Sequence, residues 1–518
     1  MAQARLDCVA TPLHEHLGKF ADQAPHALIV MPLLKALPDD LPARAQLAAV
    51  LARRDMKLDE LVKTPVAIDL PGGGHGVYVM VDTAEDRYTQ LSVLRKAAML
   101  LIDETPAEVA LAVYGAADDE VPQLAREALY VLWLNGAPLP TRKKKAPKAL
   151  KRIVLHAAFA SADFAPVAAL AAANVLARQL TRLPPNELTP GHYREKVRML
   201  AKARGWQIEE FDFRKLRRMG AGAFCAVAQG SHEEDAAIVH LSYQPRGVRA
   251  ATKAAASAGM KRVAIVGKGI CFDTGGHNLK PARYMAGMHE DMNGSAVALA
   301  LLQAIDDLRL PVAVDVWLAI AQNHISPLAY KQNDIVTALD GTHIEIIHTD
   351  AEGRLVLADT LNMATRQEKT AKGEVRASSR EARGKPDLVI DFATLTGSMI
   401  AALGNRYAGV FASSDALAAL AVGAGRQSGE RICVFPMDKD YEAALDSKVA
   451  DIKQCTLEGD ADHILAARFL KRFTHESPWL HVDLSSASCS GGLGAVASDL
   501  TGFGVAWGVA LLAQWAAD

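Results

Sequence analysis

Apolar and polar positions alternate in two different rhythms along the first 160 residues. Short apolar runs bounded by polar residues predict strands at 26–33, 77–83, 108–115 and 153–159. Apolar residues at three- and four-residue spacing predict helices between some of them, at 42–54, 87–102 and 121–133. This mixture of strands and helices is typical of an α/β domain.

The same alternation continues through the rest of the chain. A long helical pattern covers 164–183, and Thr189-Pro190 has the cap and first-turn proline of a helix start. Later apolar runs predict the strands of one central sheet with helices on both faces: RVAIVG (262–267), VDVWLAIA (314–321), IEII (344–347), DLVIDFATLTG (387–397), YAGVFAS (407–413) and WLHVDLS (479–485). The chain therefore predicts a smaller N-terminal α/β domain and a larger C-terminal α/β domain whose mixed sheet is flanked by helices.

Composition narrows the class of protein. Half of the 518 residues are hydrophobic, which is enough for a large core, and the net charge of −2 gives no general attraction to nucleic acid. The six cysteines are scattered without a C-x-x-C pair, as expected of reduced thiols in the cytoplasm. The N-terminus has no signal-peptide pattern, and no apolar run is long enough for a membrane span.

Three polar segments have competing interpretations. PGGGHG at 71–76 lies between strands and lacks the Lys-Ser/Thr ending of a phosphate loop, which favours a turn. The basic run RKKKAPKALKR at 142–152 has no interleaved aromatics, which favours a solvated surface over nucleic-acid binding. The polar stretch at 367–386 has the composition of a mobile loop, and the sequence does not decide whether it covers a site or an oligomer surface.

The segment HTDAEGR, 348–354, contains the most specific chemistry. Asp350 and Glu352 stand two apart, and Arg354 follows them. In an extended segment, alternate side chains share one face, so we expect both carboxylates to point at one spot. Two aligned carboxylates repel each other, and a divalent metal between them removes that repulsion. Taken alone, such a pair is more often an ordinary surface feature.

A second charged group lies upstream, within about ninety residues of the first. The segment VGKGICFDTGG, 266–276, places Lys268 and Asp273 at the end of a predicted strand. Lys280 follows, and Asp291 comes after a further step in HEDMNGSA. Strand ends and glycine-rich loops are where α/β sheets gather catalytic residues, so we expect one site to contain both groups.

These segments together resemble the leucyl aminopeptidase (cytosol aminopeptidase) family, peptidase family M17. The chain has HTDAEGR where the family has NTDAEGR, and GKGICFDTGG where the family has GKG-x-x-FD-[ST]-GG. Further similar segments are PPNELTP, FATLTG, VADIKQ, WLHVDLSS and LTGFGV. The resemblance is strong over about residues 170–518. It divides the chain into an N-terminal domain (1–165), a linking helix (166–188) and a catalytic domain (189–518).

The resemblance implies a metal-dependent aminopeptidase that removes the N-terminal residue from peptides with a water activated by two metal ions, zinc or manganese. Asp273, Asp350 and Glu352 would hold one ion. Lys268, as a neutral amine, would hold the other together with Asp273, Asp291 and Glu352. It also implies a cytoplasmic homohexamer. Narrow dipeptidases (for Cys-Gly, for example) and a DNA-binding regulator that keeps the fold are the alternatives.

The resemblance also assigns residues that do not bind metal. Lys280 would polarise the scissile carbonyl, and Arg354 would anchor a bicarbonate ion that acts as general base. The free α-amino group of the substrate would bind a metal and Asp291, which makes the enzyme an exopeptidase. The residues expected to contact the substrate are Met288, Thr394, Leu395, Gly397, Ser485 and Ser488.

The chain departs from the family pattern at several positions. His348 replaces the usual asparagine, and His277 and His289 stand near the other motif residues. Extra metal ligation by these histidines is one interpretation, and packing around the site or exposure to solvent is the favoured one. Ser485 and Ser488 fall where the family has small or apolar pocket residues, so the usual preference for leucine is less secure for this chain.

Overall fold

The computed structural model describes residues 3–13, 26–70, 73–231, 235–245, 260–366 and 385–517. They form two compact units. The first unit takes in Met1–Val175, Arg426–Glu430 and Ser488–Thr501, and the second Leu176–Gly425, Arg431–Ala487 and Gly502–Asp518. Most of the polar stretch 367–386, predicted to be a loop, lies outside the described residues.

A six-stranded sheet forms the centre of the first unit, in the order β1-β6-β5-β2-β4-β3. Its strands are β1 (Arg5–Val9), β2 (His26–Pro32), β3 (Val66–Leu70), β4 (Gly74–Val81), β5 (Glu108–Val113) and β6 (Arg152–His156). Its neighbouring strands pair in parallel except β3 and β4, which form an antiparallel hairpin. β3 ends at Leu70 and β4 begins at Gly74, so the last three residues of the segment 71–76, predicted to be a turn, belong to β4.

Both faces of this sheet are buried. Along β2, Leu28 and Val30 pack in one hydrophobic cluster, whereas Ala27, Ile29 and Met31 pack in another. A strand that is buried on both faces has a continuous run of apolar residues, so β2 could be predicted from the sequence. The helices of the unit are α2 (Arg44–Arg53), α3 (Arg87–Ile102) and α4 (Val121–Asn135), with 3-10 turns η1 (Leu58–Val62) and η2 (Ser161–Phe164). The three predicted helices are confirmed.

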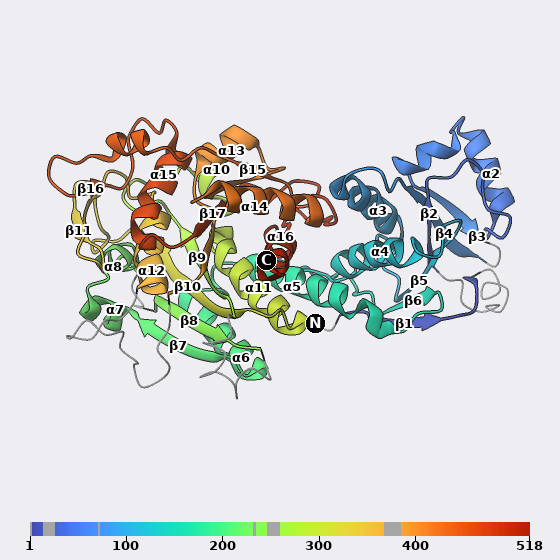
Figure 1. The fold of residues 1–518 in the computed structure, drawn as a ribbon, viewed down its shortest axis with the longest axis horizontal. Coiled ribbons are helices and arrows are strands. Elements are labelled where there is room, and N and C mark those ends of the chain that lie inside the picture. Colours follow the sequence, from blue (N-terminus) through green and yellow to red (C-terminus); the bar gives the residue numbers. More distant parts are fainter. Residues whose placement is uncertain are drawn as a thin grey trace. The chain divides into compact units, whose positions relative to one another are not determined.

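An eight-stranded mixed sheet forms the centre of the second unit, in the order β15-β14-β17-β13-β9-β10-β8-β7 (Figure 1). Its strands are β7 (Gln207–Asp212), β8 (Ala237–Tyr243), β9 (Arg262–Asp273), β10 (Ala313–Asn323), β13 (Leu388–Ala393), β14 (Ala408–Ala412), β15 (Ile432–Val434) and β17 (Trp479–Asp483). The neighbours β10, β9, β13 and β17 are parallel, and antiparallel pairing occurs toward both edges. The predicted mixed sheet is confirmed.

Helices cover both faces of this sheet. The helices of the unit are the end of α5 (Ala165–Thr181), α6 (Pro190–Arg204), α7 (Phe213–Met219), α8 (Gly222–Ala228), α10 (Ala282–Met285), α11 (Asn293–Leu308), α12 (Glu352–Thr365), α13 (Gly397–Leu403), α14 (Asp415–Ser428), α15 (Asp462–Lys471) and α16 (Val505–Ala517). Three 3-10 turns accompany them: η4 (Met288–Glu290), η5 (Lys439–Leu445) and η6 (Arg472–Thr474). Thr189 caps α6 by accepting the His192 N–H at 3.3 Å, as the Thr-Pro pair predicts.

One strand prediction is wrong. The IEII segment does not join the central sheet. Only His343–Glu345 is extended, as β12, and it pairs with β11 (Ile335–Thr337) and β16 (Ile452–Lys453) in a separate three-stranded sheet. The apolar residues Ile344 and Ile346 are buried in the cluster that contains α8 and α12, so their burial does not depend on the central sheet. No helix within the described ranges is long and apolar enough to cross a membrane.

A buried carboxylate connects α12 to its surroundings. Asp359 is fully buried, and its two oxygens accept the N–H groups of Phe224 at 2.8 Å and Leu339 at 2.7 Å. Burial raises the pKa of Asp359 to about 7. The side chain therefore fixes the helix that begins at Glu352 to α8 and to the β11–β12 connection.

Replacing Asp359 by Asn is expected to destabilise the protein by about 1–3 kcal/mol, because the amide NH2 would face one of the two buried N–H donors. The folded state holds a proton on Asp359 up to about pH 7, whereas the unfolded chain releases it near pH 4. The stabilising effect of this proton is complete below about pH 4 and is lost as the pH rises through 7. The stability gap between wild type and Asp359→Asn should therefore narrow from about pH 4 to pH 7 and stay constant above that. Denaturant unfolding of metal-free protein measures this gap.

Asp446→Asn, at an exposed position, is the control and should show a gap within about 0.5 kcal/mol of zero at every pH. A gap for Asp359→Asn that widened with rising pH would contradict the protonation of Asp359.

Candidate functional site

The site lies at the carboxyl ends of the central parallel strands. Asp273 is the last residue of β9 and Asn323 is the last residue of β10, while Thr394 comes directly after β13. Asn323 Nδ2 donates to Asp273 Oδ1 at 2.9 Å, so two neighbouring strand ends are joined there. This is the edge of an α/β sheet at which ligands generally bind.

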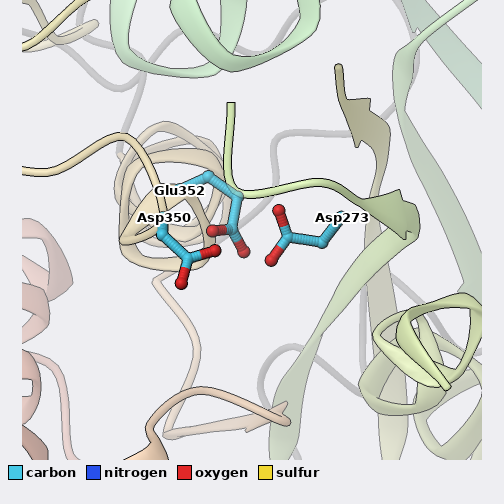
Figure 2. A group of neighbouring side chains, drawn as sticks. All are labelled: Asp273, Asp350 and Glu352. Carbon is cyan, nitrogen blue, oxygen red and sulfur yellow. The ribbon is translucent and has the colours of Figure 1, made fainter. Parts of the chain in front are cut away.

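Asp350 and Glu352 reach this edge from the start of α12 (Figure 2). Asp350 is in a turn and Glu352 is the first residue of the helix, so the prediction of an extended segment is wrong. A helix start brings the two carboxylates together instead, and its unpaired N–H groups favour negative charge there. Ligand oxygens of Asp273, Asp350 and Glu352 all lie within 4.8 Å of one another. Figure 2 shows the Asp273 carboxylate directed toward the other two.

The Lys268 side chain lies on the buried side of this group of carboxylates. Its Nζ lies 2.8 Å from Asp291 Oδ1 and 2.9 Å from Glu352 Oε1, and it donates to the Thr394 carbonyl at 3.0 Å. The Lys268 side chain is 3% exposed and that of Asp291 is 6% exposed, so both charges are almost fully desolvated. Thr394 Oγ1 also donates to Asp291 Oδ1, at 2.7 Å. The structure therefore brings Asp291 into the same group as the three other carboxylates.

Lys280 lies at the more open side of the group. Its Nζ is 2.9 Å from Asp273 Oδ2 and also contacts Asp350 Oδ1. Its side chain is 14% exposed, compared with 3% for Lys268. The two lysines thus differ in accessibility, and Lys280 is the one within reach of an incoming molecule.

The charges of the group shift several pKa values. Burial alone lowers the pKa of Lys268, but the charges of Asp291, Glu352 and Asp273 outweigh burial, so its pKa stands above the ordinary lysine value. The pKa of Lys280 is raised in the same way, by Asp273, Glu352 and Asp350 against the effect of burial. Burial raises the pKa values of Asp291 and Asp350. In the chain alone, Lys268 is therefore an ammonium and not the neutral amine expected of a ligand.

Oxygen atoms with unused lone pairs show what the group could hold. Glu352 Oε2 and Asp291 Oδ2 are buried and have no hydrogen-bond partner within the described part of the chain. A buried carboxylate oxygen without a partner costs free energy unless a cation approaches it. Carboxylate oxygens suit manganese and, with a nitrogen ligand, zinc. The donors present therefore fit divalent metal ions.

Two glycines allow these side chains to approach one another. A Cβ atom at Gly353 would lie 2.7 Å from Cε and 2.8 Å from Nζ of Lys268, closer than real atoms approach. Gly275, two residues after the strand end at Asp273, has φ of +86°, and its N–H donates to Asp273 Oδ1 at 2.8 Å. One glycine of each motif thus has a steric or conformational reason in this chain.

A network behind the carboxylates was not predicted from the sequence. Thr349 N donates to Asn278 Oδ1 at 2.8 Å, and Asn278 N donates to Thr349 Oγ1 at 2.8 Å, so the two motif loops hold each other. The Thr349 carbonyl accepts from Asn323 Nδ2 and from Tyr330 Oη. Asn323 could have been suspected from its place at a strand end, but Tyr330 lies in a loop with no motif around it.

The three histidines take separate positions. His348 Nδ1 accepts the Asp350 N–H at 3.2 Å, which supports the backbone of the carboxylate turn. Burial, with Lys280 and Arg354, lowers the pKa of His348. His277 is exposed and His289 is half-buried, and burial lowers the pKa of His289. Within the described residues, the group of possible metal ligands contains none of the three.

The residues predicted to contact the substrate lie in several different places. Leu395 lies beside Gly353, and its N–H donates to Asp483 Oδ1 at 3.0 Å. Gly397 is exposed at the start of α13, and Met288 begins η4, three residues before Asp291. Ser485 is buried and donates to the Tyr407 carbonyl at 2.6 Å. Ser488 belongs to the first unit, where it pairs with Leu500.

Arg354 is buried behind Glu352 with partners of its own. Nη1 donates to the Gln454 carbonyl at 2.8 Å, and Nη2 donates to both carboxylate oxygens of Asp462, at 2.8 and 2.9 Å. Asp462 was not singled out in the sequence. It stands 108 positions from Arg354, and no local pattern connects the two.

Comparison with known proteins gives consistent matches. The model of the cytosol aminopeptidase family, catalytic domain, matches residues 175–509. A probable cytosol aminopeptidase of Stutzerimonas stutzeri is 39% identical over 68% of this chain and 66% of its own length. Another, of Parasynechococcus marenigrum, is 37% identical over 77% of this chain and 76% of its own length.

Solved structures agree with these matches. The bottromycin maturation enzyme BotP in complex with Mn has a TM-score of 0.77 at 28% identity, covering 95% of this chain and 100% of that one. A mutant of tomato leucine aminopeptidase has a TM-score of 0.77 at 24% identity, covering 99% of this chain and 97% of that one. The second likeness concerns the fold alone.

Gly353→Ala is expected to weaken binding of divalent metal at least about tenfold, because the new methyl group displaces Lys268 from Glu352 and Asp291. Isothermal titration of metal-free protein with Mn²⁺ or Zn²⁺ measures the affinity. Far-UV circular dichroism should stay that of wild type.

Gly423→Ala in α14 is the matched control. A Cβ atom there meets only Gln514 Oε1, at 3.4 Å, so metal affinity should not change. Equal affinities for Gly353→Ala and wild type would show that the position of Lys268 does not matter for metal binding.

Proposed function

This chain belongs to the cytosol aminopeptidase family and is a metal-dependent aminopeptidase, and we propose that it is a two-metal exopeptidase acting on peptides with a free N-terminus. The family resemblance predicted from the motifs is thereby confirmed. One observation carries the two-metal proposal. Four carboxylates, of which all but Asp350 are buried, meet at the sheet edge, and the buried Asp291 and Glu352 keep oxygens without partners in the described chain.

The proposed ligand sets are those that the family resemblance implies. Asp273, Asp350 and Glu352 would hold one ion, which agrees with the close approach of their oxygens. Lys268, Asp273, Asp291 and Glu352 would hold the other, and Lys268 must then lose its proton. When bound, the ions would supply Lewis-acid polarisation of the scissile carbonyl and a water molecule of lowered pKa.

The side chains around these ligands define what the substrate must offer. Asp291 Oδ2 has no partner within the described chain and can accept a hydrogen bond from a free α-amino group. Internal peptide bonds have no such amine, so this requirement restricts cleavage to chain ends. Lys280 can donate to the carbonyl oxygen as it gains negative charge, and its partial exposure supports that role.

The pocket that would receive the side chain of the substrate's N-terminal residue is also part of the proposal. Met288, Thr394, Leu395 and Gly397 of the second unit would line it, with Ser485 as a departure that makes it more polar. Ser488, also expected there from the sequence, belongs to the first unit. The Ser485 hydroxyl already donates its hydrogen bond to the Tyr407 carbonyl, which limits the polarity that Ser485 would add to the pocket. The preferred N-terminal residue therefore has to be measured.

The finer properties rest on the resemblance. We propose zinc or manganese as the metal, a cytoplasmic location and a homohexamer. BotP was solved with Mn, which makes manganese the first ion to test. A bicarbonate ion at Arg354 stays a prediction of the resemblance, although two of the guanidinium nitrogens already have partners in this chain.

A panel of aminoacyl-arylamides and dipeptides tests the activity. Metal-free protein reconstituted with Mn²⁺ or Zn²⁺ should hydrolyse substrates that have a free α-amino group and leave their N-acetylated forms intact. Cleavage of Cys-Gly alone would favour the narrow dipeptidase. Lack of hydrolysis with every metal, combined with salt-dependent DNA binding in a gel-shift assay, would favour the regulator.

Two substitutions separate metal binding from carbonyl activation. Lys280→Ala should lower kcat by about 10²–10³-fold, because a donor to the developing oxyanion is lost. Its metal content should stay that of wild type, since removing a cation from Asp273 and Asp350 does not weaken their attraction for metal. Glu352→Ala should lose metal itself. Steady-state kinetics and elemental analysis of the same samples measure both quantities.

Lys331→Ala is the control, because Lys331 is exposed and its ion pair with Asp334 is on the surface. It should match wild type in kcat and in metal content. Loss of metal to the same extent in Lys280→Ala and Glu352→Ala would rule out the separate role assigned to Lys280.

A further inference from the structure

Arg354 stands two residues after Glu352 in α12 and is almost entirely buried. Its side chain is 2% exposed, so its charge needs a negative partner inside the protein. Within the described chain that partner is Asp462, whose two oxygens both accept from Nη2. The Gln454 carbonyl accepts from Nη1, and the third nitrogen, Nε, has no partner among the described residues.

Asp462 is well placed to be a permanent partner of Arg354. It is the first residue of α15, and α15 packs against α12, so neither side chain extends from a loose loop. The Asp462 side chain is 24% exposed, which leaves its carboxylate accessible from one side.

We propose that Asp462 is the built-in anion of Arg354, so that hydrolysis by this chain needs no bicarbonate. This inference rests on the proposed aminopeptidase function. It replaces the bicarbonate that the family resemblance predicts with a carboxylate of the chain itself. Asp462 is a positioning residue: it neutralises and orients Arg354, which in turn stands beside Glu352.

The balance of charge supports a protein carboxylate over a free anion. The group already contains the carboxylates of Asp273, Asp291, Asp350 and Glu352, with Lys268 and Lys280 between them. Among the described residues, Arg354 is a further positive charge close to Glu352, and Asp462 balances it through two short contacts. A bicarbonate ion would add negative charge next to a guanidinium that is already neutralised, and it would have to compete with a carboxylate that is held in place.

The test compares wild type with Asp462→Ala and Asp462→Asn in degassed, bicarbonate-free buffer. Wild-type kcat should change less than twofold when bicarbonate is added. Asp462→Ala should lose at least about tenfold in kcat and regain most of it, with saturation, on addition of bicarbonate or formate. Asp462→Asn keeps the shape without the charge and should lose activity with weaker recovery, because its amide still fills the space beside Nη2.

A second readout does not depend on turnover. Isothermal titration of metal-free protein with formate should detect one site in Asp462→Ala and none in wild type. Glu442→Ala is the matched control. Like Asp462, Glu442 pairs with a buried arginine, which in its case is Arg468 of α15. That variant should keep wild-type kcat, and anions should not change its activity.

Two results would overturn the proposal. Stimulation of wild type several-fold by bicarbonate would show that an external anion binds Arg354 in spite of Asp462, with Nε–H as the free donor. Absence of both anion rescue and formate binding in folded Asp462→Ala would show that Asp462 has only a structural role. If wild type hydrolysed none of the substrates, the proposed function would fail, while the titration with formate would still decide whether Asp462 occupies the anion position.

Discussion

The mutual repulsion of carboxylates that meet at one largely buried point is the constraint on which the site depends. Asp273, Asp350 and Glu352 bring their oxygens within 4.8 Å of one another, and Asp291 joins them through Lys268. Charges of one sign stay together in a poorly solvated place only if cations stand between them. The arrangement is therefore unfavourable as an isolated cluster and favourable as a cation site, which is why it indicates function and not stability.

Lysine ammonium groups supply part of that positive charge in the chain alone, and this gives Lys268 two alternative states. With its pKa raised by three carboxylates, it is a cation that bridges Asp291 and Glu352. A metal ligand must instead be a neutral amine with a free lone pair. A divalent ion favours the deprotonated form of a neighbouring group. If Lys268 is a metal ligand, as proposed, binding of metal would be coupled to release of the Lys268 proton.

Features of this structure could be predicted from the sequence where neighbouring residues alone specify them. Strands β2, β9 and β13 are continuous apolar runs because both of their faces are buried, so they were predictable. The polar edge strand β7, QIEEFD, has no such run and was missed. The motif residues were found because their spacing is specific, but the D-x-E pair was expected in an extended segment, and its carboxylates instead meet at a helix start.

Partners that are distant in sequence could not be predicted in this way. Asn323 and Tyr330 hold the Thr349 carbonyl through contacts that only the packed sheet creates. Asp462 has no motif around it, and its importance follows only from the buried guanidinium that it meets.

These partners also explain how the site keeps its shape when the charges change. Asp273 Oδ1 is held by the Gly275 N–H and by Asn323, and neither donor carries a full charge. Asn278 and Thr349 exchange hydrogen bonds between the two motif loops, and Asp359 fixes α12 from its buried side. Such neutral contacts do not depend on whether a lysine or a metal balances the carboxylates. The backbone can therefore stay in one conformation while the identity of the cation changes, which is the preorganisation that a metal-activated hydrolase requires.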